Sequence, residues 1–386
     1  MTEHSGPPDP GHDAPQCASM WHSPAMTSEE RSRGVLLINL GTPDSPSPGD
    51  VRRYLREFLS DRRVIDIPGL PRWLLLNLVI LPFRPRRAAR AYAKIWTEDG
   101  SPLLSISRKL QRGVADTLDS ESASGARSER AGRKTRVELA MRYGSPSIRD
   151  SLHALLDDQP DEIIILPLFP QYASASTGSA LAEVFEVLSR HPVPATIRTI
   201  GSFYDHPAFI DALVETARPL LSEFDPDHLL MSFHGLPQSQ ILKGDAGGQH
   251  CLKADDCCDE ICAANRNCYS AHCYATARAL AGALTLEAGE YSVCFQSRLG
   301  RAKWLDPDLV NRLPELAAQG VERLAVACPA FVADCLETVE EVGIRAREQW
   351  RELGGKELLL LPCVNDHPAW IRGVVDLVAG AAQTPG

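Results

Sequence analysis

The chain has 386 residues, of which 44% are hydrophobic and 23% charged, enough apolar material for about two globular domains. Its formal net charge of -10 argues against a general nucleic-acid binder, which needs a basic surface to meet phosphate groups. No apolar segment of signal-peptide type follows a basic start, so we expect a cytoplasmic protein.

Eight short aliphatic segments alternate with amphipathic stretches, a pattern typical of βαβ units and mainly parallel sheets. They form two sets of four: the first segment of each set ends in Gly-x-Pro, and the third runs into a proline-containing turn. We therefore predict two similar α/β domains at 34–205 and 206–366, with a disordered tail at 1–33 and a helix and tail at 367–386. The expected strands are 35–40, 137–141, 162–166 and 195–200, then 228–233, 291–296, 323–327 and 357–361.

Residues 73–83 are nearly all apolar, and five arginines flank them. At about 11 residues the run is well short of the ~20 that span a bilayer. We expect an amphipathic lip that dips into a membrane interface or grips a flat apolar ligand. The alternative is a buried core helix with a solvated basic end. The arginines are Arg72, Arg84, Arg86, Arg87 and Arg90.

His234 follows a predicted buried strand and precedes Gly235, so its ring is expected at a strand end where the backbone turns tightly. Ligands of open parallel sheets sit beyond the carboxyl ends of the strands, which brings Gly41, Pro170, His234 and Phe331 to one cleft. Most lone histidines are structural. A neutral imidazole at a cleft edge can, however, accept a proton or bind a metal near neutral pH.

Asp334, Glu337 and Glu341 follow the third strand of the second set at spacing i, i+3 and i+7. This spacing stacks three carboxylates on one face of an α-helix. Such a face is either simply solvated or, where it opens into a cleft, binds and hands over a hard divalent cation.

Six of the eleven cysteines fall within 251–273, in what looks like an insertion at 245–273. Closely spaced thiols in a reducing compartment indicate metal or cluster ligation before disulfides. A Cys₄ iron–sulfur cluster, a structural zinc assisted by His250 or His272, and unligated thiols remain the three interpretations.

From about Gly34 onward the chain resembles the ferrochelatases, and ordered motif matches carry the resemblance. The motifs are Leu37-Ile38-Asn39-Leu40-Gly41-Thr42-Pro43, Arg142-Tyr143, Pro170-Gln171-Tyr172 with Ser176-Thr177-Gly178-Ser179, the segment 232–237, Phe295-Gln296-Ser297-Arg298 with Trp304, and the segment 334–341.

The resemblance implies an enzyme that inserts Fe²⁺ into protoporphyrin IX to form protohaem, the last step of haem biosynthesis. The fold would be two Rossmann-like, chelatase-type domains facing a porphyrin cleft. By resemblance, His234 is the active-site histidine, which accepts pyrrole protons or ligates the iron, and Glu337 is its partner carboxylate. Asp334 and Glu341 match the acidic path for the metal. Porphyrin-binding positions are matched by Arg142, Tyr143 and Gln296.

Certain bacterial ferrochelatases hold a 2Fe-2S cluster in an internal segment like 245–273. We assign Cys251, Cys258, Cys268 and Cys273 as its ligands, with Cys257 and Cys262 as alternates. The expected partners are a porphyrin and, peripherally, a membrane, without nucleic acid. The sequence defines no oligomeric state.

Two alternatives stay open. One is a chelatase for coproporphyrin III or another divalent ion; Gly235 resembles protoporphyrin-using bacterial members and favours protoporphyrin IX. The other is a non-catalytic tetrapyrrole or iron–sulfur binding protein, against which the presence of both His234 and Glu337 argues.

Overall fold

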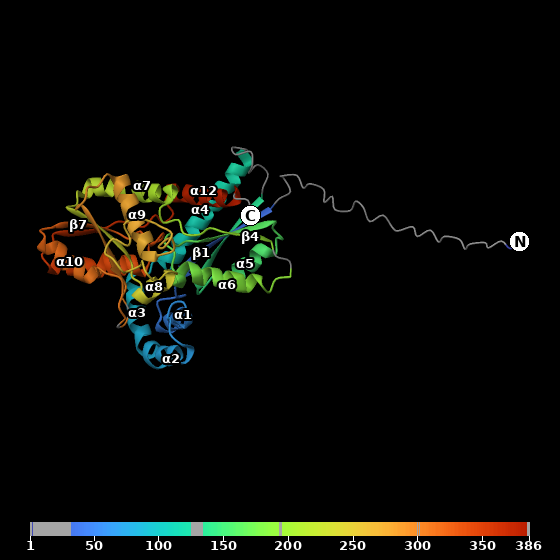
Figure 1. Cartoon of the computed structure of the whole chain (residues 1–386), viewed down its shortest axis with the longest axis horizontal. Helices are drawn as coiled ribbons and strands as arrows, with labels where there is room; N and C mark the ends of the chain where they lie inside the picture. Colours follow the sequence, from blue (N-terminus) through green and yellow to red (C-terminus); the bar gives the residue numbers. More distant parts are fainter. Residues whose placement is uncertain are drawn as a thin grey trace.

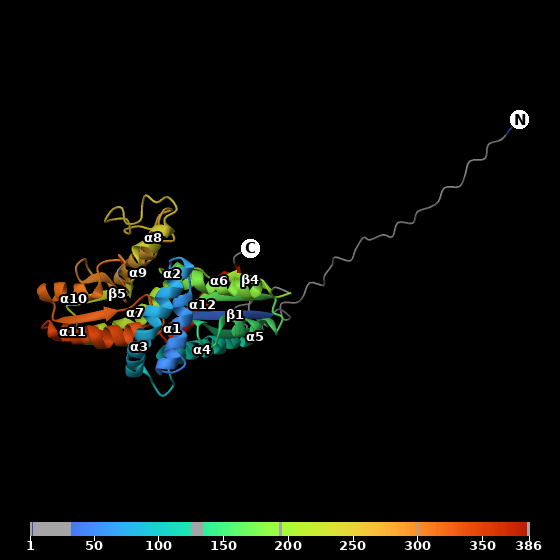
Figure 2. The ribbon, with the colours of Figure 1, turned by 90° about the horizontal axis from the view of Figure 1, so that it is seen from below.

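The computed structural model describes residue 2 and residues 32–124, 134–192, 195–298, 300 and 302–383. The predicted tail at 1–33 lies almost entirely outside the described residues. Two four-stranded parallel sheets lie side by side along the long axis of the molecule (Figure 1, Figure 2). The predicted α/β fold with two similar units is confirmed.

The first sheet has the order β2-β1-β3-β4, and the second has the matching order β6-β5-β7-β8. Continuous aliphatic runs form these strands because helices cover both faces of each sheet. The strands are β1 Ser32–Gly41, β2 Lys134–Tyr143, β3 Glu162–Pro167, β4 Thr196–Thr199, β5 His228–His234, β6 Tyr291–Gln296, β7 Arg323–Ala327 and β8 Glu357–Leu360. All eight predicted strands are present, with ends shifted by three residues at most.

The helices between β1 and β4 begin with α1, whose N-cap Ser47 accepts a hydrogen bond from the Asp50 amide. The helices are α1 Pro48–Ser60, α2 Gly69–Leu74, η2 Leu75–Ile80, α3 Leu81–Ile95, α4 Pro102–Ser124, α5 Ile148–Leu156, η3 Ser174–Gly178 and α6 Ser179–Leu188; the η elements are π-helical. Elements α1 to α3 protrude from the body of the molecule (Figure 1). Together with the second unit they frame the candidate site.

The rest of the chain contributes α7 Pro207–Phe224, α8 Gln238–Gly244, α9 Tyr269–Leu284, α10 Leu309–Ala318, η4 Leu336–Ala346, α11 Arg347–Glu352 and α12 Pro368–Gln383. One hydrophobic core runs through both units: Val35 and Leu37 of β1 and Met231 of β5 belong to the same cluster. The C-terminal helix α12 lies against α4 and α7, so it covers the first sheet rather than the second. Among the described residues no helix is both long enough and apolar enough to cross a membrane.

Candidate active site

His234 lies at the carboxyl end of β5, and its side chain is half-buried. Its Nδ1 atom is 2.7 Å from the carbonyl oxygen of Gly235. Because a carbonyl only accepts hydrogen bonds, Nδ1 carries the proton in the neutral ring. The Nε2 atom therefore keeps its lone pair, which can accept a proton or bind a divalent cation.

Gly235 sets the direction in which the backbone leaves β5. Its amide donates to the carbonyl oxygen of Gln296 at 2.7 Å. A Cβ atom on residue 235 would lie 2.8 Å from that same oxygen. The close pairing of β5 and β6 at this level therefore requires glycine, because any side chain would push the strands apart.

Gln296 pairs in register with His234 and is 1% exposed. Its Oε1 atom accepts a hydrogen bond from the Ser232 hydroxyl at 2.6 Å, and its Nε2 atom donates to the backbone oxygen of Glu337 at 2.7 Å. Gln296 therefore ties the β5 strand end to the start of η4, and its contact with a porphyrin stays a prediction.

The acidic segment after β7 departs from the predicted α-helix. Residues Leu336–Ala346 form the π-helix η4, with Cys335 as N-cap, and i→i+5 hydrogen bonding widens its turns. Asp334 precedes the helix, where its carboxylate accepts hydrogen bonds from Asn365 at 2.7 Å and Thr338 at 3.0 Å. The prediction of three carboxylates on one α-helical face is therefore wrong, and Asp334 anchors the helix start.

Glu341 and Glu337 differ in their surroundings. The Glu341 carboxylate accepts hydrogen bonds from the amide and the hydroxyl of Ser297, at 2.9 and 2.6 Å. Glu337 is the neighbour of Cys335 and Tyr92: burial and the Glu337 charge raise the pKa of both the thiol and the hydroxyl. Both groups stay protonated, and the Cys335 thiol hydrogen-bonds to Glu337.

Asp61, just after α1, organises Arg142 and Tyr143. Its carboxylate pairs with Arg142 at 3.0 Å and accepts from the Tyr143 hydroxyl at 2.9 Å and the Ser179 hydroxyl at 2.5 Å. Although burial opposes it, these bonds and the Arg63 amide hold the pKa of Asp61 below its usual range. Tyr143 is fully buried. The two predicted porphyrin contacts thus lie together, bound to an acid that sequence reasoning missed.

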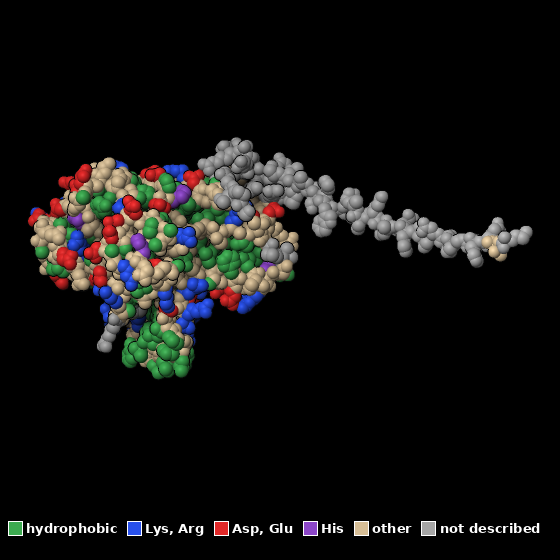
Figure 3. Space-filling view, viewed as in Figure 1, with side chains coloured by type: hydrophobic (Ala, Val, Ile, Leu, Met, Phe, Trp, Pro, Cys, Tyr) green, Lys and Arg blue, Asp and Glu red, His purple; other side chains and the backbone are tan. Residues whose placement is uncertain are grey.

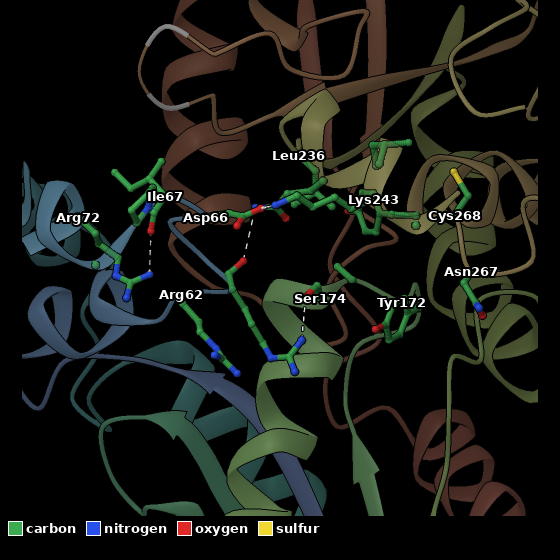
Figure 4. Close-up of a pocket in the computed structure, with 18 residues that line it drawn as sticks. Arg62, Asp66, Ile67, Arg72, Tyr172, Ser174, Leu236, Lys243, Asn267 and Cys268 are labelled. Atoms are coloured by element: carbon green, nitrogen blue, oxygen red, sulfur yellow. Dashed lines mark hydrogen bonds and ion pairs between the residues drawn. The ribbon is translucent and has the colours of Figure 1, made fainter. Parts of the chain in front are cut away.

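A cavity of about 820 Å³ opens beside the β5 strand end (Figure 4). The segment after α1, the loop at 172–174 and the residues after His234 form its walls. One of its arginines is held in place, since Arg63 donates to the Ser174 hydroxyl at 3.0 Å. The charged side chains in its lining are Arg62, Arg63, Asp66, Arg72 and Lys243, so the cavity carries an excess of positive charge.

The predicted lip is exposed. Trp73, Leu78 and Phe83 are 57%, 61% and 76% exposed, which contradicts the alternative of a buried core helix. Figure 3 shows a hydrophobic knob at the protruding end of the molecule with Lys and Arg side chains next to it. An apolar tip with a basic collar suits an interface between water and an apolar phase.

The cysteine-rich segment is organised by two buried polar residues. The Asp245 carboxylate accepts hydrogen bonds from the amides of residues 247, 248, 250 and 251. The side-chain amide of Asn265 donates to the carbonyl oxygen of Cys257 at 3.0 Å. The backbone carbonyl of Asn265 accepts from the Cys268 amide at 2.7 Å. The segment therefore has a defined fold that ends where α9 begins.

Five of the six thiols are buried, and Cys262 is exposed. The Cys268 thiol interacts with those of Cys251 and Cys258, and Cys257 Sγ lies 3.8 Å from Cys258 Sγ. Burial raises the pKa of Cys251 and Cys257, as expected for neutral thiols. Across the described ranges, no three His, Cys, Asp or Glu side chains are arranged to hold a metal ion.

The two units are α/β, with His234 at the end of a strand of the second sheet and the acidic helix η4 after another strand of that sheet. The chain belongs to the ferrochelatase family, whose model matches residues 32–382. This match confirms the predicted family and the predicted enzyme class, which inserts Fe²⁺ into a porphyrin.

Relatives named ferrochelatase cover most of the chain. One from Coxiella burnetii (strain Dugway 5J108-111) is 45% identical over 91% of this chain and 94% of its own length. One from Stutzerimonas stutzeri (strain A1501) is 45% identical over 91% and 98%, and one from Pseudomonas fluorescens (strain Pf0-1) is 46% identical over 89% and 96%. Among solved structures, SirB from Bacillus subtilis with Fe³⁺ aligns with a TM-score of 0.49 at 12% identity, over 91% of this chain and 96% of that one.

Proposed function

We propose that this chain inserts Fe²⁺ into protoporphyrin IX and releases protohaem and two protons, with His234 as the first proton acceptor. The observation that carries the proposal is the hydrogen bond between His234 Nδ1 and the Gly235 carbonyl. In the neutral ring this bond places the proton on Nδ1 and leaves the Nε2 lone pair as the acceptor. A positioned base of this kind contributes about 10²–10⁴-fold to a proton-transfer step.

Glu337 supplies the second group. Its backbone is fixed by Gln296, and its carboxylate lies beside the neutral donors Cys335 and Tyr92. We propose that Glu337 takes protons on from His234 or receives the incoming iron. Glu341, already bound by Ser297, continues the acidic path along η4, and Asp334 supports that path from outside the helix.

The proposed substrate is protoporphyrin IX. Gly235 supports it by resemblance to protoporphyrin-using members, and the excess positive charge of the adjoining cavity suits the carboxylate edge of a tetrapyrrole. Apolar contacts and propionate contacts can bend the ring, at about 1–5 kcal/mol of strain, and so expose the pyrrole nitrogens.

The test is an anaerobic assay with Fe²⁺ and either protoporphyrin IX or coproporphyrin III, followed by absorbance. We expect turnover of protoporphyrin IX, and a loss of at least 100-fold in kcat for His234→Ala and Glu337→Gln. The surface variants His153→Ala and Glu348→Gln are the matched controls. Near-normal chelation by His234→Ala would refute the assignment, and turnover of coproporphyrin III alone would overturn the substrate.

We propose that the cysteine-rich segment holds a 2Fe-2S cluster through Cys251, Cys258, Cys268 and Cys273. The all-thiol donor set fits such a cluster, and the mutual contacts among Cys251, Cys258 and Cys268 support it. The Leu252 amide lies 3.4 Å from Sγ of the alternate ligand Cys257, the kind of N–H contact that would tune a cluster sulfur if Cys257 replaced Cys273. The cluster would stabilise the segment, and no step of chelation passes through it.

Visible absorbance together with iron and sulfide analysis tests this proposal. A colourless protein with stoichiometric zinc would overturn it. Cys273→Ser and Cys257→Ser decide the fourth ligand: loss of the cluster only in Cys257→Ser would replace Cys273 by Cys257. The exposed Cys262→Ser is the control.

We also propose a cytoplasmic protein that touches an anionic membrane through its lip. The free thiols support a reducing compartment. Exposed Trp73 and Phe83 beside arginines support the membrane contact. Co-sedimentation with vesicles containing anionic lipid should fall in Trp73→Ser/Phe83→Ser and persist in Phe185→Ser, which removes an exposed phenylalanine elsewhere. Equal sedimentation of all three proteins would refute the contact.

A further inference from the structure

The carbonyl oxygen of His234 has a side-chain partner from a distant part of the chain. The Tyr269 hydroxyl donates a hydrogen bond to it at 2.8 Å. Tyr269 is 7% exposed and is the first residue of α9, directly after Cys268. The peptide that joins His234 to Gly235 is therefore held from both sides, by Tyr269 at its oxygen and by Gln296 at its N–H.

Rigid support of this peptide matters because the imidazole bonds to the next carbonyl along the chain. His234 Nδ1 reaches the Gly235 oxygen at 2.7 Å, a contact that depends on the rotation of the backbone between the two residues. If the 234–235 peptide turns, the Gly235 oxygen moves away from Nδ1, and the ring loses the bond that fixes its tautomer.

Tyr269 in turn is placed by the cysteine-rich segment. Cys268 is the N-cap of α9, and its amide donates to Asn265 at 2.7 Å, the residue whose side chain holds the Cys257 carbonyl. His272, one turn into α9, bonds to the carbonyl of Arg266 at 2.8 Å and stacks on Tyr204. A continuous set of contacts thus runs from the cysteines to the backbone of His234.

We propose that Tyr269 is a positioning residue for His234, through which the fold of the cysteine-rich segment controls the orientation and tautomer of the imidazole. This inference rests on the proposed role of His234. It explains why the cysteine-rich segment is present although no step of chelation passes through it. If the segment loses its fold, the Tyr269 hydroxyl moves away from the His234 carbonyl. The neutral His234 ring then no longer favours the tautomer whose lone pair is on Nε2.

The first experiment replaces Tyr269 by Phe, which removes only the hydroxyl. The control is Tyr274→Phe, later in the same helix; within the described part of the chain the Tyr274 hydroxyl makes no hydrogen bond. We expect kcat for iron insertion to fall about tenfold in Tyr269→Phe with KM for the porphyrin unchanged, and no change in the control. A purely structural role would lower the folded fraction and leave kcat per folded molecule intact, which overturns the proposal.

The second measurement is the ¹⁵N spectrum of histidine-labelled protein, with the His234 signals identified by their loss in His234→Ala. The native protein should show an Nδ1-protonated ring, and Tyr269→Phe a mixture of tautomers. An unchanged spectrum overturns the inference. If His234→Ala keeps its activity while Tyr269→Phe still alters the spectrum, the proposed function fails and the positioning role stands.

A double-mutant cycle tests the connection to the cysteines. Cys251→Ser should lower kcat in the native background but cause little further loss in Tyr269→Phe, whereas Asp255→Asn, at an exposed position of the same segment, should be neutral in both. If the effects of Cys251→Ser and Tyr269→Phe add in full, the two act independently and the coupling is refuted.

Discussion

Replacement of Gln296 by Met tests whether the β5 strand end and η4 are held together as the structure indicates. Methionine has a similar length and no hydrogen-bonding head. The change therefore removes the hydrogen bonds to Ser232 and Glu337, at 2.6 and 2.7 Å, and the weak 3.7 Å contact from Cys328 Sγ. A buried group left without a partner costs about 1–3 kcal/mol, which gives about 2–6 kcal/mol for the Ser232 hydroxyl and the Glu337 carbonyl. The Ser232 hydroxyl also interacts with Cys294. We therefore expect the lower half, about 2–4 kcal/mol, a large share of the usual ~5–15 kcal/mol of total stability.

Urea unfolding measures the loss of stability, and the anaerobic assay measures the effect on iron insertion. Because Glu337 loses its backbone anchor, kcat should fall about 10- to 100-fold, while porphyrin affinity, followed by fluorescence quenching, changes little. Gln349→Met removes one exposed hydrogen bond to Val310 and should stay within about 0.5 kcal/mol of the native protein. Full activity in a destabilised Gln296→Met protein would show that the position of Glu337 does not depend on Gln296.

Two further predictions concern charge. Asp61→Asn keeps the shape of the side chain but leaves Arg142 without its buried partner, so unfolding in urea should need about 3 kcal/mol less free energy; an unchanged midpoint would contradict the ion pair. Burial lowers the pKa of His228 in the folded protein. As the pH falls below about 6.5, the unfolded chain therefore binds a proton here before the folded protein does. The free energy of unfolding should drop over this range until the pH passes the folded pKa. His228→Gln, which can still bond to Ser292, should flatten that part of the pH profile, and an equally steep profile would assign the loss to other groups.

The sequence predicted the strands because their signal is local and continuous. A run such as 163–166 is apolar along its whole length, as expected for a strand covered on both faces. The Gly-x-Pro repeat indicated that the two units share one topology. His234 was placed correctly for the same reason, since a strand end is a local feature.

The parts that sequence reasoning missed depend on distant contacts. Asp61 precedes its partner Arg142 by 81 residues and Ser179 by 118, and no motif marks it. Tyr269 meets His234 across 35 residues, and no motif in the cysteine-rich segment marks it. The π-helix η4 has an ordinary helical composition, so the sequence predicts the usual 3.6-residue spacing for Glu337 and Glu341. Only the hydrogen-bond pattern reveals the wider turn.

The packing of α12 against α4 determines when the first unit can complete its core during synthesis. Gly113 of α4 lies so close to α12 that a Cβ atom there would meet Ile371 at 2.4 Å, and Leu110 and Val114 share the core with Trp370 and Val374. α4 ends at Ser124 and α12 ends at Gln383. At about 5–20 residues per second, the ribosome needs roughly 10–50 s after α4 to complete α12. During that interval the first unit exposes an apolar helix face. The two units look alike, yet the earlier one completes its core only when the last helix of the later one arrives.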